Sequence, residues 1–385
     1  MPGQVTTAMR RLVSDAAGPR KTVRRGHLYL LDAARGCAAL AVLFFHYVHF
    51  FFLPGTEQAM TPTEAYPLYG VFWLFFSYGK AAVPVFWMIS GFVFSRVYRD
   101  SAATSQEFFL NRFARLYPLH LLTLLLVAML QAVAVARYGH AFIYGNNDLY
   151  HFVLQLFFAS NWGLQVGDSF NGPIWSVSVE VAVYVVFWAF HRRLFALGVI
   201  GPVALMLAGF ILFMGTGNLI GQCGFFFFIG AALHYVHEAF EDDRRLIAAA
   251  VVGMMAAGLL AFASGIERIE NGVGVPAFFG GLILLLVSVE AAAAPYKRWL
   301  APVGDNTYGM YLLHVPLQLV IFIVLSRSTD VAALALSPWF LLGYIAAVIV
   351  LARISFLHFE RPMRIWLRRL GEGRAVVDRP ELAAP

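Results

Sequence analysis

Long apolar runs, repeated along the whole chain, restrict the folds that are open to this sequence. Many of them approach twenty residues, the length that an α-helix needs to cross the roughly 30 Å hydrocarbon core of a bilayer. Of the 385 residues, 60% are hydrophobic and only 13% are charged, whereas a soluble domain has roughly 25% charged residues. The sequence therefore predicts an all-α, polytopic membrane helical bundle of about ten transmembrane helices.

The boundaries of these runs predict where each helix crosses. We expect spans at 28–53, 80–97, 117–136, 174–191, 196–215, 219–236, 246–264, 274–293, 303–325 and 338–357. Two further apolar runs, 68–78 and 151–162, are too short to cross, and we expect re-entrant or interfacial pieces there on the outer side.

The basic residues predict the orientation of the bundle. Most of the 28 lysines and arginines fall in segments that the ten spans place on one side, and the other side holds only Arg137, Arg268 and Arg327. Because basic loops stay in the cytoplasm, we predict cytoplasmic termini, with a basic tail at 1–27, a transmembrane domain at 28–357 and a second tail at 358–385. The net charge of +6 thus reflects the basic residues that set the membrane orientation, and we expect no nucleic-acid partner.

The first span carries ionisable residues that need an explanation. Such side chains cost about 2.5 to 3.5 kcal/mol each inside a spanning helix, so they favour a bundle interior or a wet cavity. Arg35 and His46 lie about 20° apart around a helix, and Asp32 can pair with Arg35. His46 suits proton abstraction from an alcohol, although a neighbouring helix could also satisfy it. His49 could form a metal pair with His46, but no further ligand pattern accompanies it, and we expect no metal.

Two arginines follow in the first predicted cytoplasmic loop. Arg112 and Arg115 are spaced to grip a phosphate-bearing ligand, with Tyr117 close behind them. From these residues alone, the simpler interpretation is that both arginines only enforce topology. Ser90, beside Gly91 in the second span, could likewise be a packing contact.

The fourth and ninth spans open with polar side chains. Ser176 and Glu180 lie on one helical face, and a carboxylate at that depth needs a histidine or an arginine as its partner. In the ninth span, Tyr308 and Tyr311 share a face with His314 further round it, and they offer hydrogen bonds to a polar ligand. A structural role is equally compatible with the ninth-span pattern.

Taken in order, these motifs resemble the acyltransferase-3 family of membrane acyltransferases. The matching segments cover residues 28–362: Leu31-Asp32 through Arg35 to His46, Phe86-Trp87 through Ser90-Gly91-Phe92, Arg112 through Arg115 to Tyr117-Pro118, Trp175-Ser176 through Glu180 to Tyr184, Tyr308 through Tyr311 to His314, and Glu360 with Pro362. Trp87 stands where the family more often has phenylalanine. Each motif is weak alone, but six in sequence make the resemblance specific.

The resemblance implies an O-acyltransferase of the bacterial inner membrane. Such enzymes take an acyl group, usually acetyl, from cytoplasmic acyl-CoA and place it on a hydroxyl of a cell-surface or secreted glycan. His46 would be the catalytic histidine, acting as general base or carrying the acyl group itself, with Arg35 as its partner and Glu180 orienting or charging it. The implied substrate-binding residues are Ser90, Arg112, Arg115, Tyr117, Trp175, Ser176, Tyr308, Tyr311 and His314.

The resemblance also sets the expected partners: acyl-CoA as co-substrate, a glycan or lipid-linked glycan as acceptor, and membrane lipids. Two alternatives stay open. A transporter or flippase of a lipid-linked or anionic substrate would also bury charged residues in its pathway, and an acyltransferase could act on a lipid or a small molecule instead of a glycan.

Overall fold

The computed structural model describes residues 26–53, 55–99 and 101–371. Its regular elements within these ranges are helices, apart from one antiparallel bridge between Phe52 and Ala59. The predicted N-terminal tail falls almost entirely outside the described residues, as does the end of the C-terminal tail. The all-α prediction is confirmed.

The longer helices are α2 (Tyr29–Phe45), α3 (Tyr69–Tyr78), α4 (Ala82–Tyr98), α5 (Ser105–Tyr138), α7 (Ile174–Leu194), α8 (Ile200–Thr216), α9 (Leu219–Phe240), α10 (Arg244–Ala263), α12 (Val275–Ser288), α13 (Lys297–Asp305), α14 (Thr307–Leu325), α16 (Pro338–Ser355) and α17 (Arg361–Gly371). Short helices α6 (Leu149–Leu156), α11 (Glu267–Ile269) and α15 (Val331–Ala335) lie between them. In the described chain, nine helical segments are long and apolar enough to cross a membrane, and α8 is a shorter apolar helix. Every one of the ten predicted spans therefore corresponds to a helix.

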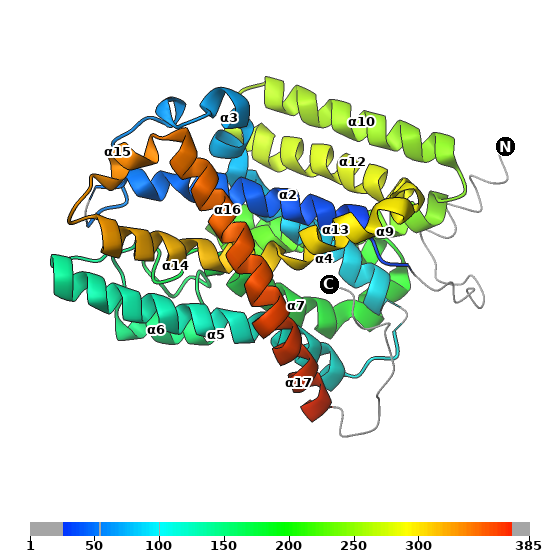
Figure 1. Ribbon diagram of the computed structural model, residues 1–385. Coiled ribbons are helices and arrows are strands. Elements are labelled where there is room, and N and C mark those ends of the chain that lie inside the picture. Colours follow the sequence, from blue (N-terminus) through cyan, green and yellow to red (C-terminus); the bar gives the residue numbers. More distant parts are fainter. Residues whose placement is uncertain (1–25, 54, 100, 372–385) are drawn as a thin grey trace.

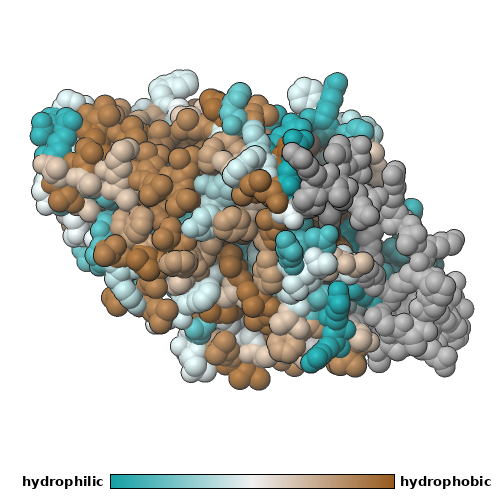
Figure 2. Space-filling view, turned by 90° about the horizontal axis from the view of Figure 1, so that it is seen from below, coloured by the Kyte–Doolittle hydropathy of each residue, from teal (hydrophilic) through white to brown (hydrophobic). Residues whose placement is uncertain are grey.

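Helix α2 runs through the centre of the bundle (Figure 1) and packs against α3, α4, α13 and α14. Helices α7 and α8 pack on α9, and α10 packs on α12. Figure 2 shows a surface that is hydrophobic across its middle, with hydrophilic side chains gathered toward the two ends. This distribution is the one that a bilayer requires of a spanning bundle.

Two local predictions are corrected by the structure. The 68–78 run is not a separate re-entrant piece, because a 3₁₀ turn (Gly79–Ala81) joins α3 to α4 in one helical segment. The first span is not α-helical throughout, since it tightens into a 3₁₀ helix from His46 to Phe51. The described start of the predicted C-terminal tail is helical, since a π-helical turn (Phe356–Glu360) continues α16 into α17.

The largest correction concerns the predicted loop that carries Arg112 and Arg115. These residues lie inside α5, which begins twelve residues before the predicted span, at Ser105. A capping box starts the helix, because the Glu107 amide donates to Thr104 Oγ1 at 3.2 Å and the Glu107 carboxylate accepts from the Thr104 amide at 2.7 Å. The sequence Thr-Ser-Gln-Glu contains this signal, and it could have been recognised.

Candidate active site

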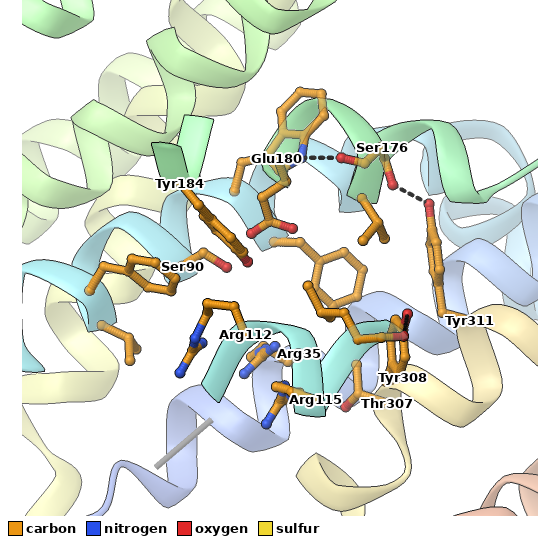
Figure 3. Close-up of a pocket in the computed structure, with 16 residues that line it drawn as sticks. Arg35, Ser90, Arg112, Arg115, Ser176, Glu180, Tyr184, Thr307, Tyr308 and Tyr311 are labelled. Atoms are coloured by element: carbon orange, nitrogen blue, oxygen red, sulfur yellow. Dashed lines mark hydrogen bonds between the residues drawn. The ribbon is translucent and has the colours of Figure 1, made fainter. Parts of the chain in front are cut away.

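A pocket of about 710 Å³ opens among α2, α4, α5, α7 and α14, and most of the predicted site residues line it. We call it the arginine pocket. Its polar lining residues are Arg35, Ser90, Arg112, Arg115, Ser176, Glu180, Tyr184, Thr307, Tyr308 and Tyr311. Residues that are hundreds of positions apart in the sequence thus face one cavity (Figure 3).

Three guanidinium groups gather on one side of this pocket (Figure 3). The Arg35 guanidinium lies 3.8 Å from the Asp32 carboxylate, as predicted. Asp32 also lies 2.6 Å from His27, so its negative charge is shared between the two partners. Arg112 and Arg115 come from successive turns of α5. Such a concentration of positive charge at a half-buried site favours a ligand with several negative charges, because guanidinium groups bind phosphates through paired hydrogen bonds.

The opposite wall of the arginine pocket carries Glu180. Its carboxylate faces Ser90 and Tyr184 (Figure 3), and its Oε1 has no hydrogen-bond partner within the described chain. The partner that the sequence predicted for this carboxylate was a histidine or an arginine. No hydrogen bond or ion pair in the described residues joins Glu180 to His46, because Glu180 faces the arginines at another depth of the bundle.

Tyrosines of α14 form the far end of the arginine pocket. Tyr311 donates a hydrogen bond to the Pro173 carbonyl at 2.8 Å, and its hydroxyl lies 2.5 Å from Ser176 Oγ. Tyr308 donates to the Leu116 carbonyl at 2.7 Å. These bonds fix the two rings against α7 and α5, so the pocket has a rigid polar floor.

Three histidines meet beyond this floor. The ring of His46 lies 5.0 Å from the rings of both His49 and His314, measured between centroids, and His314 lies 6.4 Å from the ring of Tyr311. His46 Nδ1 is 2.9 Å from the Val42 carbonyl, which can only accept a hydrogen bond. The neutral ring therefore carries its hydrogen on Nδ1 and a lone pair on Nε2.

Not every predicted site residue reaches the arginine pocket. His46 and His314 lie beyond its Tyr311 end, Trp175 packs edge-on against Trp87 at 5.9 Å, and Tyr117 stacks on Phe113 at 4.6 Å. Arg35 and His46 therefore do not line one cavity. The chain between them is α-helical up to Phe45, and its rise of roughly 16 Å over eleven residues places the two side chains at different depths of the bundle.

A second pocket, of about 540 Å³, adjoins the first and shares Arg115 and Tyr308 with it. Arg364 from α17 also lines it, and the sequence analysis had not selected this residue. Its membership of a basic helix was visible in the sequence, but its position beside α5 depends on tertiary packing. His27, outside the spans, lies here too, and its hydrogen bond to Asp32 raises its pKa above the usual value.

The opposite end of the bundle has different chemistry. Tyr144 lies there in the connection between α5 and α7, and its hydroxyl is 3.2 Å from His49 Nε2. In the same connection, burial raises the pKa of Asp168 to about 6, and the nearby charge of Glu57 adds to this effect. Arginines therefore lie at one end of the bundle, together with the carboxylates of the second pocket, whereas Tyr144 and Asp168 lie at the other end.

Comparisons with known proteins place the chain in a family. The family described as "Acyltransferase domain" (acyltransferase 3) matches residues 28–356. The chain is also similar to "Acyltransferase MdmB" of Streptomyces mycarofaciens, with 33% identity over 116 residues, which are 30% of this chain and 29% of that protein. The similarity to this curated relative thus spans less than a third of its length, and no solved structure matches. Because the family match covers most of the sequence and all the helices that form the pocket, the chain belongs to the acyltransferase 3 family of membrane acyltransferases.

Proposed function

We propose that this protein is an acyl-CoA-dependent O-acyltransferase of the bacterial inner membrane, with both termini in the cytoplasm. The observation that carries the proposal is the arginine pocket, in which Arg35, Arg112 and Arg115 face one cavity. The phosphates of acyl-CoA would bind these guanidinium groups. Its narrow pantetheine arm would then extend past Tyr308 and Tyr311 toward His46.

The chemistry follows from the tautomer of His46. Its Nε2 lone pair removes the proton from an acceptor hydroxyl while the oxygen attacks the thioester carbonyl. As the carbon–sulfur bond breaks, the imidazolium returns this proton to the thiolate, so the products are an ester and a free thiol. In the alternative route, Nε2 itself accepts the acyl group before the hydroxyl attacks.

We propose acetyl as the transferred group and a hydroxyl of a cell-surface or secreted glycan, free or lipid-linked, as its acceptor. The polar side chains between the arginine pocket and the base support a hydroxyl-bearing acceptor, since Tyr311, His314 and His46 follow one another there. Ser176 and Ser90 extend this lining toward the arginines. Metal ions have no role in this scheme, because the imidazole supplies the base.

The proposal predicts that His46→Ala abolishes thiol release from acetyl-CoA. Loss of a general base costs 10² to 10⁴ in rate, so we expect at least a hundredfold decrease. The measurement is free-thiol release by purified protein in nanodiscs, with and without a crude glycan extract. His358→Ala is the matched control, because His358 is exposed in the π-helical turn.

The outcomes separate the alternatives. Release that needs both the extract and His46 supports transfer to a glycan. Full activity in folded His46→Ala protein contradicts the mechanism. No release by folded wild-type protein with any acyl donor contradicts the enzyme and favours transport.

A further inference from the structure

A chain of three buried side chains connects the outer end of the bundle to the backbone of His46. Tyr144 Oη lies 3.2 Å from His49 Nε2, and His49 Nδ1 lies 2.8 Å from Gln318 Oε1. Gln318 Nε2 then donates to the backbone carbonyl of His46 at 2.9 Å. We call Tyr144, His49 and Gln318 the positioning chain.

The direction of every hydrogen bond in the positioning chain is determined. The His46 carbonyl can only accept a hydrogen bond, so the amide nitrogen Nε2 of Gln318 faces it. The amide oxygen Oε1 of Gln318 therefore faces His49. His49 must therefore donate from Nδ1, which leaves a lone pair on Nε2 in the neutral ring. Tyr144 donates to that lone pair. Each of the three residues is at most 5% exposed, so water does not compete for these bonds.

The positioning chain ends at the residue where the first span changes geometry. Helix α2 is α-helical up to Phe45, and the 3₁₀ helix begins at His46. The 3₁₀ helix ends at Phe51, and a tightened last segment of this kind is common where an α-helix ends. The bond from Gln318 holds the carbonyl at this transition, and it therefore restricts the direction in which the imidazole of His46 points.

Strained backbone places Tyr144 at the start of the positioning chain. The preceding residue, Ile143, has a φ of 68°, although a β-branched side chain strongly disfavours this left-handed conformation. Such strain costs about 1 to 3 kcal/mol and persists only where neighbouring contacts enforce it. Here Gln131 bonds both the carbonyl and the amide of Phe142, at 2.8 and 3.2 Å, and Asn147 donates to the Tyr144 carbonyl at 2.6 Å.

We infer that Tyr144, His49 and Gln318 are positioning residues that fix the base His46 for acyl transfer. This inference rests on the proposed function. The three side chains act through hydrogen bonds and the backbone, without touching the acyl donor. Because the reacting atoms must be aligned closely, misplacement of a base by about 1 Å can cost on the order of 10²-fold in rate.

The first test is a set of isosteric variants. Tyr144→Phe and Gln318→Met each remove hydrogen bonds while keeping much of the side-chain volume. We expect kcat for acetyl transfer to the glycan extract to fall about tenfold, the effect of roughly 1.4 kcal/mol, with KM for acetyl-CoA unchanged. Tyr138→Phe is the matched control, since that hydroxyl donates at 2.9 Å to the Ile323 carbonyl, also on α14 but away from His46.

A second test compares two variants of His49 and asks whether the losses at Tyr144 and Gln318 are additive. His49→Asn keeps a donor near the place of Nδ1, whereas His49→Leu does not, so we expect the asparagine variant to retain several-fold more activity. The double variant of Tyr144 and Gln318 should lose little more than either single variant, because both interrupt one chain.

The inference and the proposed function fail in different ways. If Tyr144→Phe and Gln318→Met behave like Tyr138→Phe in an enzyme that needs His46, the positioning chain is refuted alone. It is also refuted if these variants raise KM for acetyl-CoA and leave kcat unchanged. If folded wild-type protein releases no thiol, or if His46→Ala is fully active, the proposed function falls and the positioning chain with it.

Discussion

Arg115 lies where the two pockets meet, because it lines both the arginine pocket and the pocket beside α17. From the sequence alone, this arginine looked like a topology determinant as much as a ligand-binding residue. Its neighbourhood holds both signs of charge: Arg35, Arg112, Arg364 and Asp32 all act on it, and Asp305 and Glu360 line the second pocket beside it. Within the arginine pocket, however, three arginines face the single carboxylate of Glu180, and this excess of positive charge favours an anionic ligand.

We expect Arg115→Gln to raise KM for acetyl-CoA about tenfold or more, because a charged hydrogen bond contributes roughly 1.5 to 3 kcal/mol. The effect on kcat should be small. Acetyl-pantetheine, which lacks the nucleotide phosphates, should be used equally well by variant and wild type. Arg369→Gln is the control on exposed α17 surface. Equal losses with both donors would show that Arg115 has a structural role instead.

At the level of helices, α4 and α9 pack very closely beside the arginine pocket. A Cβ added to Gly91 would collide with the Phe227 carbonyl, and one added to Gly230 would collide with the Met88 carbonyl. The two helices are therefore held together by reciprocal glycines, as in other tight membrane interfaces. Gly91 is a packing residue, while its neighbour Ser90 lines the arginine pocket.

Gly91→Ala should separate α4 from α9 and lower stability by about 1 to 3 kcal/mol, the usual cost of overpacking. We expect a lower midpoint of thermal unfolding in nanodiscs, together with reduced thiol release. Gly253→Ala on α10 has no heavy atom within 4 Å of the new Cβ and should be neutral. An unchanged midpoint for Gly91→Ala would contradict the close contact.

The whole molecule has two chemically different ends. Arg115 and Arg364 line the second pocket at one end, and Tyr144 lies near Asp168 at the other. The surface between the two hydrophilic ends of the molecule is mostly hydrophobic (Figure 2). The distribution of basic residues predicts that the arginine end faces the cytoplasm. In this predicted orientation, the arginine pocket that we propose for acyl-CoA would open toward the cytoplasm.

Cysteine labelling tests the orientation. In a background without Cys37 and Cys223, Asp242→Cys should react with an impermeant maleimide only after the cells are permeabilised. Thr329→Cys, at the opposite end, should react in intact cells. Both positions are exposed. The reverse pattern of labelling would invert the predicted topology.

The sequence by itself determined the class of fold, the approximate helices and most of the polar lining of the arginine pocket. Span length and basic residues act locally along the chain, so they can be counted without knowing which helices touch. The extension of α5 back to Ser105 was also readable, from its capping box. Motifs such as Ser176 with Glu180 predicted a buried site because polar groups are costly in a membrane.

Only the tertiary structure decided which of these residues share a cavity. It separated His46 from Arg35 and Glu180, added Arg364, and linked His46 to Gln318 across 272 positions of sequence. Rotation of each helix about its axis depends on how its side chains pack against neighbouring helices. These interactions join distant parts of the chain, and hydrophobic periodicity carries no information about them.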